Sequence, residues 1–306
     1  MLLMLEQSRT ERPVKLSSDF AGLELKEYHT DVTWRRTMNY AAAVNDNNPL
    51  YFDDEREDGI VAPPMFTVAV TWPICERIWE YIQADTFPRA LLVNLVHYTE
   101  HLTFHRIMRP GDRLTVRGRI SAILPHRAGT LMIVRLAGVD ETGAPVFTEH
   151  LGGLLRGVQC DGEANVAEPL PVIPASPANA APFWEKSVFV DPLAPFIYDG
   201  CTNIFFPIHT SVAFARGVGL PDIILQGTAT LAYAVRDLTN YEADGNPLLL
   251  RSVAGCFTGM VLPGTQLQVA LVGRTSDDCG TDLFFVVRNA QGDKVVSDGY
   301  ARIQQN

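Results

Sequence analysis

The pattern of apolar and polar positions runs through the same series of elements twice. In each half a polar stretch without regular periodicity precedes one long helix, and strands with alternating positions follow. Apolar residues at helical spacing predict a helix over residues 227–241 in the second half. The matching helix of the first half is expected over residues 65–82, with a kink or break at Pro73, because proline removes a helical hydrogen bond. Strands are predicted over residues 113–120, 130–136, 266–272 and 283–287.

Short motifs recur in the same order in both halves and indicate an internal duplication. One such match has little meaning, but three in register are typical of two copies of one folding unit. The matched sets are Tyr40, Pro49 and Tyr51 with Tyr198, Pro207 and His209; Phe104 and Pro110-Gly111 with Phe257 and Pro263-Gly264; and residues 143–147 with 292–296.

A stretch rich in proline and alanine, residues 161–183, lies between the two copies. It predicts an extended linker, because proline fixes φ and removes a hydrogen-bond donor. The alternative, one long loop inside a single domain, is less favoured because such loops are uncommon in compact domains. The chain is therefore expected to form an N-terminal lobe over residues 1–160 and a C-terminal lobe over residues 184–306. Each lobe should combine one central helix with an antiparallel sheet, which is an α+β architecture.

Composition narrows the classes of function. A length of 306 residues fits two domains, and 47% hydrophobic residues supply ample material for their cores. The net charge of −10 argues against a nucleic-acid partner, which requires a basic surface. Five cysteines without a C-x-x-C pair indicate no disulfide framework and favour a reducing, cytoplasmic location. We expect no secretory leader and no membrane partner, because the longest nearly apolar run, residues 62–74, is short and contains three prolines.

Several of these motifs resemble the MaoC dehydratase family. In the first half the resemblance rests on residues 40–53, 59–64 and 104–112; in the second half it rests on Pro207-Ile208-His209, Ala213-Phe214-Ala215, residues 219–222 and Ile224-Leu225-Gln226-Gly227. The second set is similar to the family's hydratase signature D-x-N-P-x-H followed by P-I-L-H-G. The resemblance implies a double hot-dog fold, in which each lobe has a long helix wrapped by an antiparallel sheet.

In that family the signature Asp and His activate the water that adds to a 2-enoyl thioester, or assist the reverse dehydration. A proton must leave water while the carbonyl oxygen gains negative charge, and a His/Asp pair beside a helix N-terminus suits both needs. This chain divides the pair. The N-terminal copy has Asp46 but Tyr51 in place of His, and the C-terminal copy has His209 but Ile204 at the Asp position.

The resemblance assigns the reaction centre to the C-terminal lobe. His209 is expected to be the base, although an isolated histidine can also be a surface or capping residue. The motif around it also resembles a longer pattern of mesaconyl-CoA-hydratase-like members, matched by Tyr198, Thr202, Ile208 and His209 with Asn203 displaced by one position. Asp199 and Asn203 are the candidate partners of His209; both could instead be simple turn formers. Asp46 is expected to be a helix or turn cap.

The backbone N–H groups of Gly227 and Thr228, at a positive helix end, are expected to hold the carbonyl oxygen. Gly227 could instead only begin the helix. The substrate pocket is predicted from residues that flank these motifs: Tyr198, Phe205, Phe206, Gln226, Tyr51, Pro64 and Met65. His97, His101 and His105 are not expected to bind a metal ion, since i and i+4 on a strand lie about 13 Å apart.

The resulting prediction is a hydro-lyase that hydrates a 2-enoyl-CoA or dehydrates a 3-hydroxyacyl-CoA. The thioester carrier is CoA or an acyl carrier protein, no redox or metal cofactor is implied, and a homodimer is expected. Two alternatives stay open. One is a hot-dog thioesterase, for which Asp237 is the available carboxylate on the long helix. The other is a non-catalytic acyl-binding subunit of a hydratase complex, which the missing Asp of the C-terminal motif favours.

Overall fold

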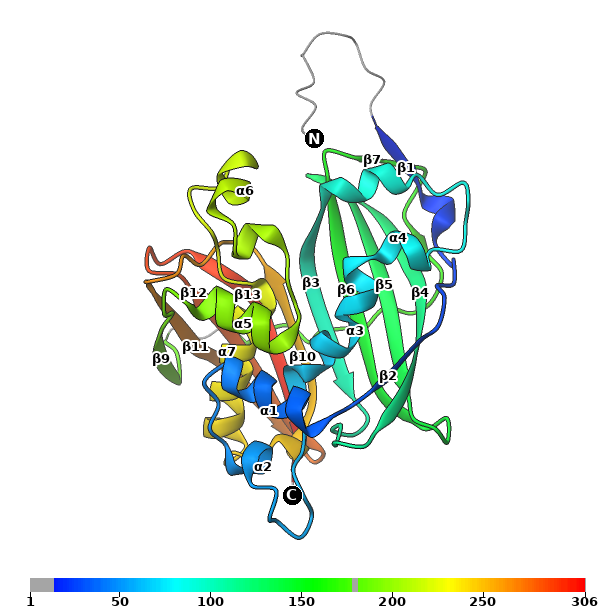
Figure 1. The fold of residues 1–306 in the computed structure, drawn as a ribbon. Coiled ribbons are helices and arrows are strands. Elements are labelled where there is room, and N and C mark those ends of the chain that lie inside the picture. The colour runs from blue at the N-terminus through cyan, green and yellow to red at the C-terminus, as the bar shows by residue number, and fades with distance from the viewer. Residues whose placement is uncertain (1–13, 178–180, 306) are drawn as a thin grey trace.

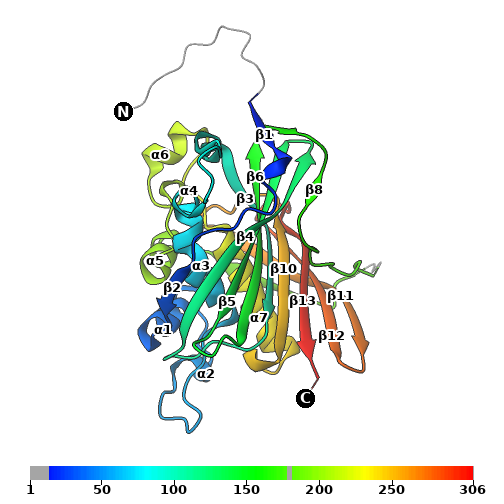
Figure 2. The same cartoon turned by 90° about the vertical axis from the view of Figure 1, so that its right-hand side faces the viewer.

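A computed structural model of the protein describes residues 14–177 and 181–305. One antiparallel sheet of eleven strands passes through both halves of the chain, and helices cover one of its faces (Figures 1 and 2). Ten strands follow each other across the sheet in the order β2-β4-β5-β6-β3-β10-β13-β12-β11-β9, and β8 pairs with β4. Their bounds are β2 Tyr28–Asp31, β3 Leu95–Phe104, β4 Arg113–His126, β5 Gly129–Val139, β6 Pro145–Arg156, β8 Asn165–Val166, β9 Trp184–Phe189, β10 Leu250–Phe257, β11 Gln266–Asp277, β12 Gly280–Arg288 and β13 Lys294–Gln304.

The two lobes meet where β3 pairs with β10, and the order of strands is the same when counted outward from this seam. Leu102 lies opposite Val253 and His101 opposite Ala254 in the antiparallel register. Each lobe therefore contributes five strands of the ten-strand path in equivalent positions. This arrangement confirms the predicted double hot-dog with joined sheets, and the four predicted strands lie within β4, β5, β11 and β12. The remaining two strands, β1 (Lys15–Ser17) and β7 (Gln159–Asp161), form a small parallel pair.

The long helix of the C-terminal lobe, α7, runs from Gly227 to Glu242, as the periodicity predicted. Its counterpart begins with the short 3-10 turn η2 (Pro64–Phe66), continues as α3 (Thr67–Glu76) and ends with α4 (Ile78–Tyr81). The helix is not broken at Pro73, which lies inside α3, but is interrupted at Arg77. Pro73 has no N–H for the carbonyl of Ala69, and the Arg36 guanidinium donates to that carbonyl at 3.4 Å instead.

The stretches that were expected to be irregular contain further helices. The N-terminal lobe has α1 (Trp34–Ala43) and α2 (Pro49–Phe52), and the C-terminal lobe has α5 (Ala194–Thr202), the 3-10 turn η4 (Pro207–His209) and α6 (Val212–Gly217). The expectation was wrong because these segments are short and closely punctuated by turns, which hides their periodicity. The other 3-10 turns are η1 Ser18–Phe20, η3 Arg89–Asn94 and η5 Pro247–Leu249.

The helices α1 and α5 pack against each other across the pseudo-two-fold axis, in front of the seam (Figure 1). Both belong to a single hydrophobic core that combines side chains of the two lobes. Four tyrosines are fully buried in it: Tyr40, Tyr51, Tyr198 and Tyr233.

The first part of the predicted linker is not extended away from the lobes, since β8 pairs with β4. Residues 167–177 form neither helix nor strand. Within the described residues, no helix is long and apolar enough to cross a membrane.

Candidate functional site

His209 is held at the end of η4 by the loop that leads into α7. Its Nδ1 lies 2.8 Å from the carbonyl oxygen of Ile224, and the N–H of Ile224 donates to the carbonyl of Ile208 at 3.3 Å. A carbonyl can only accept, so Nδ1 carries the hydrogen and Nε2 keeps its lone pair. Burial lowers the pKa of His209 to about 4, so the ring is neutral at pH 7. The imidazole therefore carries its hydrogen on Nδ1, and its Nε2 can accept a proton.

The N-terminus of α7 follows directly after this loop. The N–H of Leu225 donates to the carbonyl of Val261 at 2.8 Å, and the amide of Gln226 donates to the carbonyl of Pro195 at 3.0 Å. Gln226 is 2% exposed, and its side chain makes no capping hydrogen bond to the helix. The first N–H groups of a helix have no partner within it and attract negative charge. A Cβ at Gly227 would lie 3.1 Å from the Phe257 ring, so a side chain would crowd this end of α7.

Tyr198 joins this helix end to the other lobe. Its hydroxyl donates to Oγ1 of Thr228 at 3.1 Å and lies 3.0 Å from the hydroxyl of Tyr40. Tyr40 and Tyr198 occupy equivalent positions in the two sequence repeats, so the pseudo-two-fold axis brings them together. Tyr198, predicted as a pocket residue, is 1% exposed and contacts the helix end through Thr228.

The predicted partners of His209 lie on the segment before it. Asn203 ends α5 in a left-handed conformation with φ of 59°, and its N–H donates to the Asp199 carbonyl at 2.9 Å. Both residues thus take part in the turn that ends the helix. Among the described residues, neither side chain forms a hydrogen bond or ion pair with His209. Burial raises the pKa of Asp199.

Aliphatic and aromatic side chains fill the rest of this segment. Ile204, at the position of the signature Asp, is 3% exposed and packs in the core. Phe205 and Phe206 are each 46% exposed, and Phe206 contacts the ring of Phe214 with centroids 5.9 Å apart. The two phenylalanines therefore lie at the surface beside His209.

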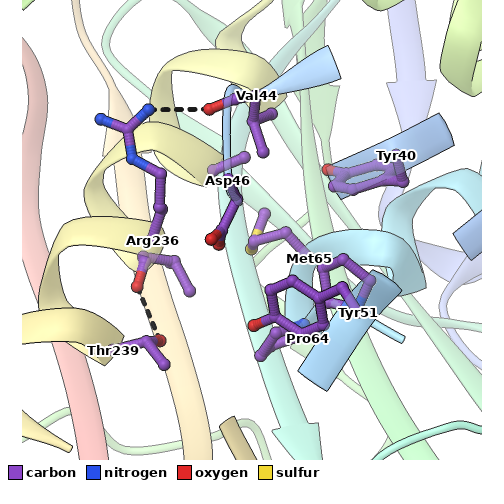
Figure 3. Close-up of a pocket in the computed structure, with 11 residues that line it drawn as sticks. Tyr40, Val44, Asp46, Tyr51, Pro64, Met65, Arg236 and Thr239 are labelled. Atoms are coloured by element: carbon purple, nitrogen blue, oxygen red, sulfur yellow. Dashed lines mark hydrogen bonds between the residues drawn. The ribbon is translucent and has the colours of Figure 1, made fainter. Parts of the chain in front are cut away.

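Three other predicted pocket residues surround a different cavity. Tyr51, Pro64 and Met65 line a space of about 10 Å³, enough for one water molecule, between the N-terminal motif and α7 (Figure 3). The carboxyl group of Asp46 and the hydroxyl of Tyr51 point toward this space, while the Arg236 guanidinium turns away and donates to the Val44 carbonyl at 2.7 Å (Figure 3). His209 and Gly227 do not line it.

Asp46 caps a turn, as predicted, by accepting from the N–H of Asn48 at 3.2 Å. Burial raises the pKa of Asp46 to about 6. The positive charge of Arg236 lowers this pKa only in part, because Arg236 forms an ion pair with Asp237 at 2.9 Å. The cavity is thus the N-terminal equivalent of the His209 site, with a phenol in place of the imidazole and a cation on the facing helix.

A buried acidic cluster of β3 and β6 escaped the sequence analysis. Nε2 of His97 lies 3.1 Å from Oε2 of Glu100, and Glu100 and Glu149 are each 1% exposed. Burial raises the pKa of Glu100 to about 8 and that of Glu149 well above its usual range. The His97 ring packs 4.7 Å from that of Phe257, the residue that crowds Gly227. A β-bulge between His97 and Thr99 changes the alternation, so the sequence gives no clear sign that His97 and Glu100 face each other.

Each half of the chain matches a known protein family. Residues 184–289 match the family described as MaoC like domain, and residues 19–149 match the family described as FAS1-like, dehydratase domain region. The C-terminal lobe contains a MaoC-like domain, and the N-terminal lobe contains a FAS1-like dehydratase region. The two matched regions lie one in each half of the chain.

Relatives and solved structures cover most of the chain at low identity. It is 23% identical over 288 residues to the probable enoyl-CoA hydratase 2 of Dictyostelium discoideum, covering 92% of this chain and 94% of the relative. It is 24% identical over 274 residues, 88% of the chain, to the peroxisomal multifunctional enzyme type 2 of Drosophila melanogaster. The chain spans only 44% of the length of that enzyme. The crystal structure of a MaoC-like dehydratase from Phytophthora capsici superimposes with a TM-score of 0.79 at 19% identity, covering 93% of this chain and 97% of the other.

Proposed function

We propose that the protein is a hydro-lyase that adds water to a 2-enoyl thioester or removes it from a 3-hydroxyacyl thioester. The observation that carries the proposal is the hydrogen bond from Nδ1 of His209 to the Ile224 carbonyl. This bond leaves the Nε2 lone pair free and ties η4, which carries His209, to the loop that ends at the N-terminus of α7. A proton acceptor and an oxyanion-binding helix end are the two elements that the reaction requires.

In the hydration direction, Nε2 of His209 takes a proton from water as the water oxygen bonds to the β-carbon. The π electrons of the alkene move toward the α-carbon and the carbonyl, and the N–H groups of Gly227 and Thr228 stabilise the charge on the carbonyl oxygen. The α-carbon then takes a proton, which returns the histidine to its neutral state when His209 is the donor. Dehydration follows the same path in reverse. Asp199 and Asn203 are proposed to orient the water.

The carrier of the acyl group is proposed to be CoA, with an acyl carrier protein as the second option. The matches to enoyl-CoA hydratase 2 proteins support CoA, and the match to the fatty acid synthase dehydratase region supports the carrier protein. A homodimer in the cytoplasm is the working hypothesis for the assembly, and light scattering of the purified protein tests the oligomeric state. The thioesterase alternative loses its candidate carboxylate, because Asp237 is 4% exposed and paired with Arg236.

The test uses purified protein with crotonyl-CoA and with longer and branched 2-enoyl-CoAs. Hydration removes the ultraviolet absorbance of the conjugated enoyl thioester without releasing a thiol, and a thiol reagent in a parallel sample detects hydrolysis. The proposal predicts loss of absorbance that depends on His209. Thiol release would assign a thioesterase instead, and the absence of both reactions with every thioester would favour an acyl-binding subunit.

A further inference from the structure

Three buried hydroxyl groups form a chain from the N-terminal lobe to the N-terminus of α7. The hydroxyl oxygens of Tyr40 and Tyr198 lie 3.0 Å apart, and Tyr198 donates to Oγ1 of Thr228 at 3.1 Å. Tyr40 is 0% exposed, Tyr198 is 1% exposed and Thr228 is 6% exposed. Water therefore does not compete for these hydrogen bonds, and the chain has a fixed geometry.

The direction of the chain follows from the number of hydrogens. Each hydroxyl has one hydrogen to donate. Because Tyr198 gives its hydrogen to Thr228, the hydrogen between the two phenols comes from Tyr40. Burial raises the pKa of both phenols, so neither hydrogen is lost at neutral pH. The hydrogen of Thr228 is the last in the chain and is available for a further acceptor.

Helical threonines usually return this hydrogen to the carbonyl four residues earlier. Thr230 and Thr239 of α7 do so, donating to the carbonyls of Gln226 at 3.2 Å and Val235 at 2.8 Å. For Thr228 the residue four positions earlier is Ile224, which lies before the N-cap Gln226 and therefore outside the helix. The Thr228 hydroxyl thus has no helical carbonyl to which it can return its hydrogen.

We infer that the Thr228 hydroxyl donates a hydrogen bond to the thioester carbonyl oxygen, and that Tyr40 is a positioning residue that acts on it through Tyr198. The inference rests on the proposed function, since it adds a side-chain donor to the helix end that receives the carbonyl. Hydrogen bonds in series polarise one another in a region of low dielectric constant, so each phenol makes the next hydroxyl a stronger donor. The gain is largest in the transition state, where the carbonyl oxygen carries the most charge.

Kinetics of single and double variants test the chain. Loss of an oxyanion donor lowers kcat by about 10²-fold in well-studied cases, so Thr228→Val should approach that loss while Thr228→Ser restores most of the activity. Tyr40→Phe removes one oxygen and keeps the ring contacts with Tyr198 and Phe66, each with centroids 5.9 Å apart. It should lower kcat by about 3- to 10-fold, because it weakens a cooperative chain without removing the last donor. KM should change little.

The double variant Tyr40→Phe/Thr228→Val separates positioning from general stability. If Tyr40 acts through Thr228, Tyr40→Phe has no further effect on kcat in the Thr228→Val background. Multiplied losses would overturn the inference, because they would mean that Tyr40 acts by another route. The matched control is Tyr233→Phe, which removes the hydroxyl of another buried tyrosine, 1% exposed, on α7 itself and should keep kcat.

A measurement without turnover keeps this inference separate from the proposed function. Butyryl-CoA labelled with ¹³C at the thioester carbon cannot be hydrated, and a hydrogen bond to its carbonyl oxygen moves the ¹³C resonance downfield. The bound probe should show this shift in the wild type and in Tyr233→Phe, and a smaller shift in Thr228→Val and Tyr40→Phe. Hydration by the wild type with equal shifts in all variants would overturn the inference and leave the function intact. The expected shifts without any hydration would support the donor chain and refute the hydro-lyase.

Discussion

Replacing His209 by Ala removes the proposed base and should lower kcat by about 10²- to 10⁴-fold. This loss corresponds to about 2.7–5.4 kcal/mol in the activation free energy. The same change leaves the Ile224 carbonyl without its donor at 2.8 Å, which costs on the order of 1–3 kcal/mol of folding stability. The variant should therefore fold with a lower melting temperature, and its kcat must be measured below that temperature.

Tyr51→Ala is the internal control, because Tyr51 holds the equivalent position in the first repeat. Tyr51 is 1% exposed, so truncation should cost about 3–5 kcal/mol of stability through the cavity that it creates. Its kcat should fall much less than that of His209→Ala, since the cavity beside Asp46 does not include His209. The enoyl absorbance assay and thermal unfolding of both variants give the comparison. Unchanged kcat in a folded His209→Ala preparation would refute the assignment of the base.

The pH profile gives a second measure of the same group. The pKa of His209 is lowered to about 4, and only the neutral ring accepts a proton. Protonation should therefore reduce kcat/KM about tenfold per pH unit below about pH 4, with no loss from this group between pH 5 and 8. An acid limb near pH 6.5 that vanishes in His209→Ala would contradict the burial that the structure gives this ring.

Three further predictions concern the neighbouring groups. Burial raises the pKa of Glu100 from 4.5 to about 8, so its contribution to stability is present below pH 4.5 and is lost as the pH rises to about 8. The loss amounts to at most about 5 kcal/mol. The free energy of unfolding in urea should therefore depend less on pH in Glu100→Gln than in the wild type. Gly227→Ala should lower kcat more than stability, because the new methyl group would lie 3.1 Å from Phe257 and shift the helix end, as kinetics with unfolding curves can show. Asp199→Asn and Asn203→Ala rank the water-orienting candidates by their loss of kcat. If both variants keep the kcat of the wild type, neither residue orients the water.

The sequence predicted those parts of the fold that local periodicity or turn chemistry determines. The helix α7 was placed to within one residue, because apolar residues recur along all of its length. The hydrogen bond between Tyr40 and Tyr198 could not be predicted, although the repeat matched them, since residues so distant along the chain meet only when the two sheets join. Glu100 also escaped prediction, because a carboxyl on the buried face of a strand contradicts the alternation from which strands are recognised.

The β3–β10 seam makes the assembly of the His209 site independent of dilution. In a dimer of single lobes, the equivalent strands would belong to two molecules, and the fraction with a complete site would fall at low protein concentration. Here the two halves of the Tyr40–Tyr198 contact belong to one chain, so each partner is always present at the high effective concentration of an intramolecular contact. Specific activity should therefore stay constant down to concentrations at which any homodimer has dissociated.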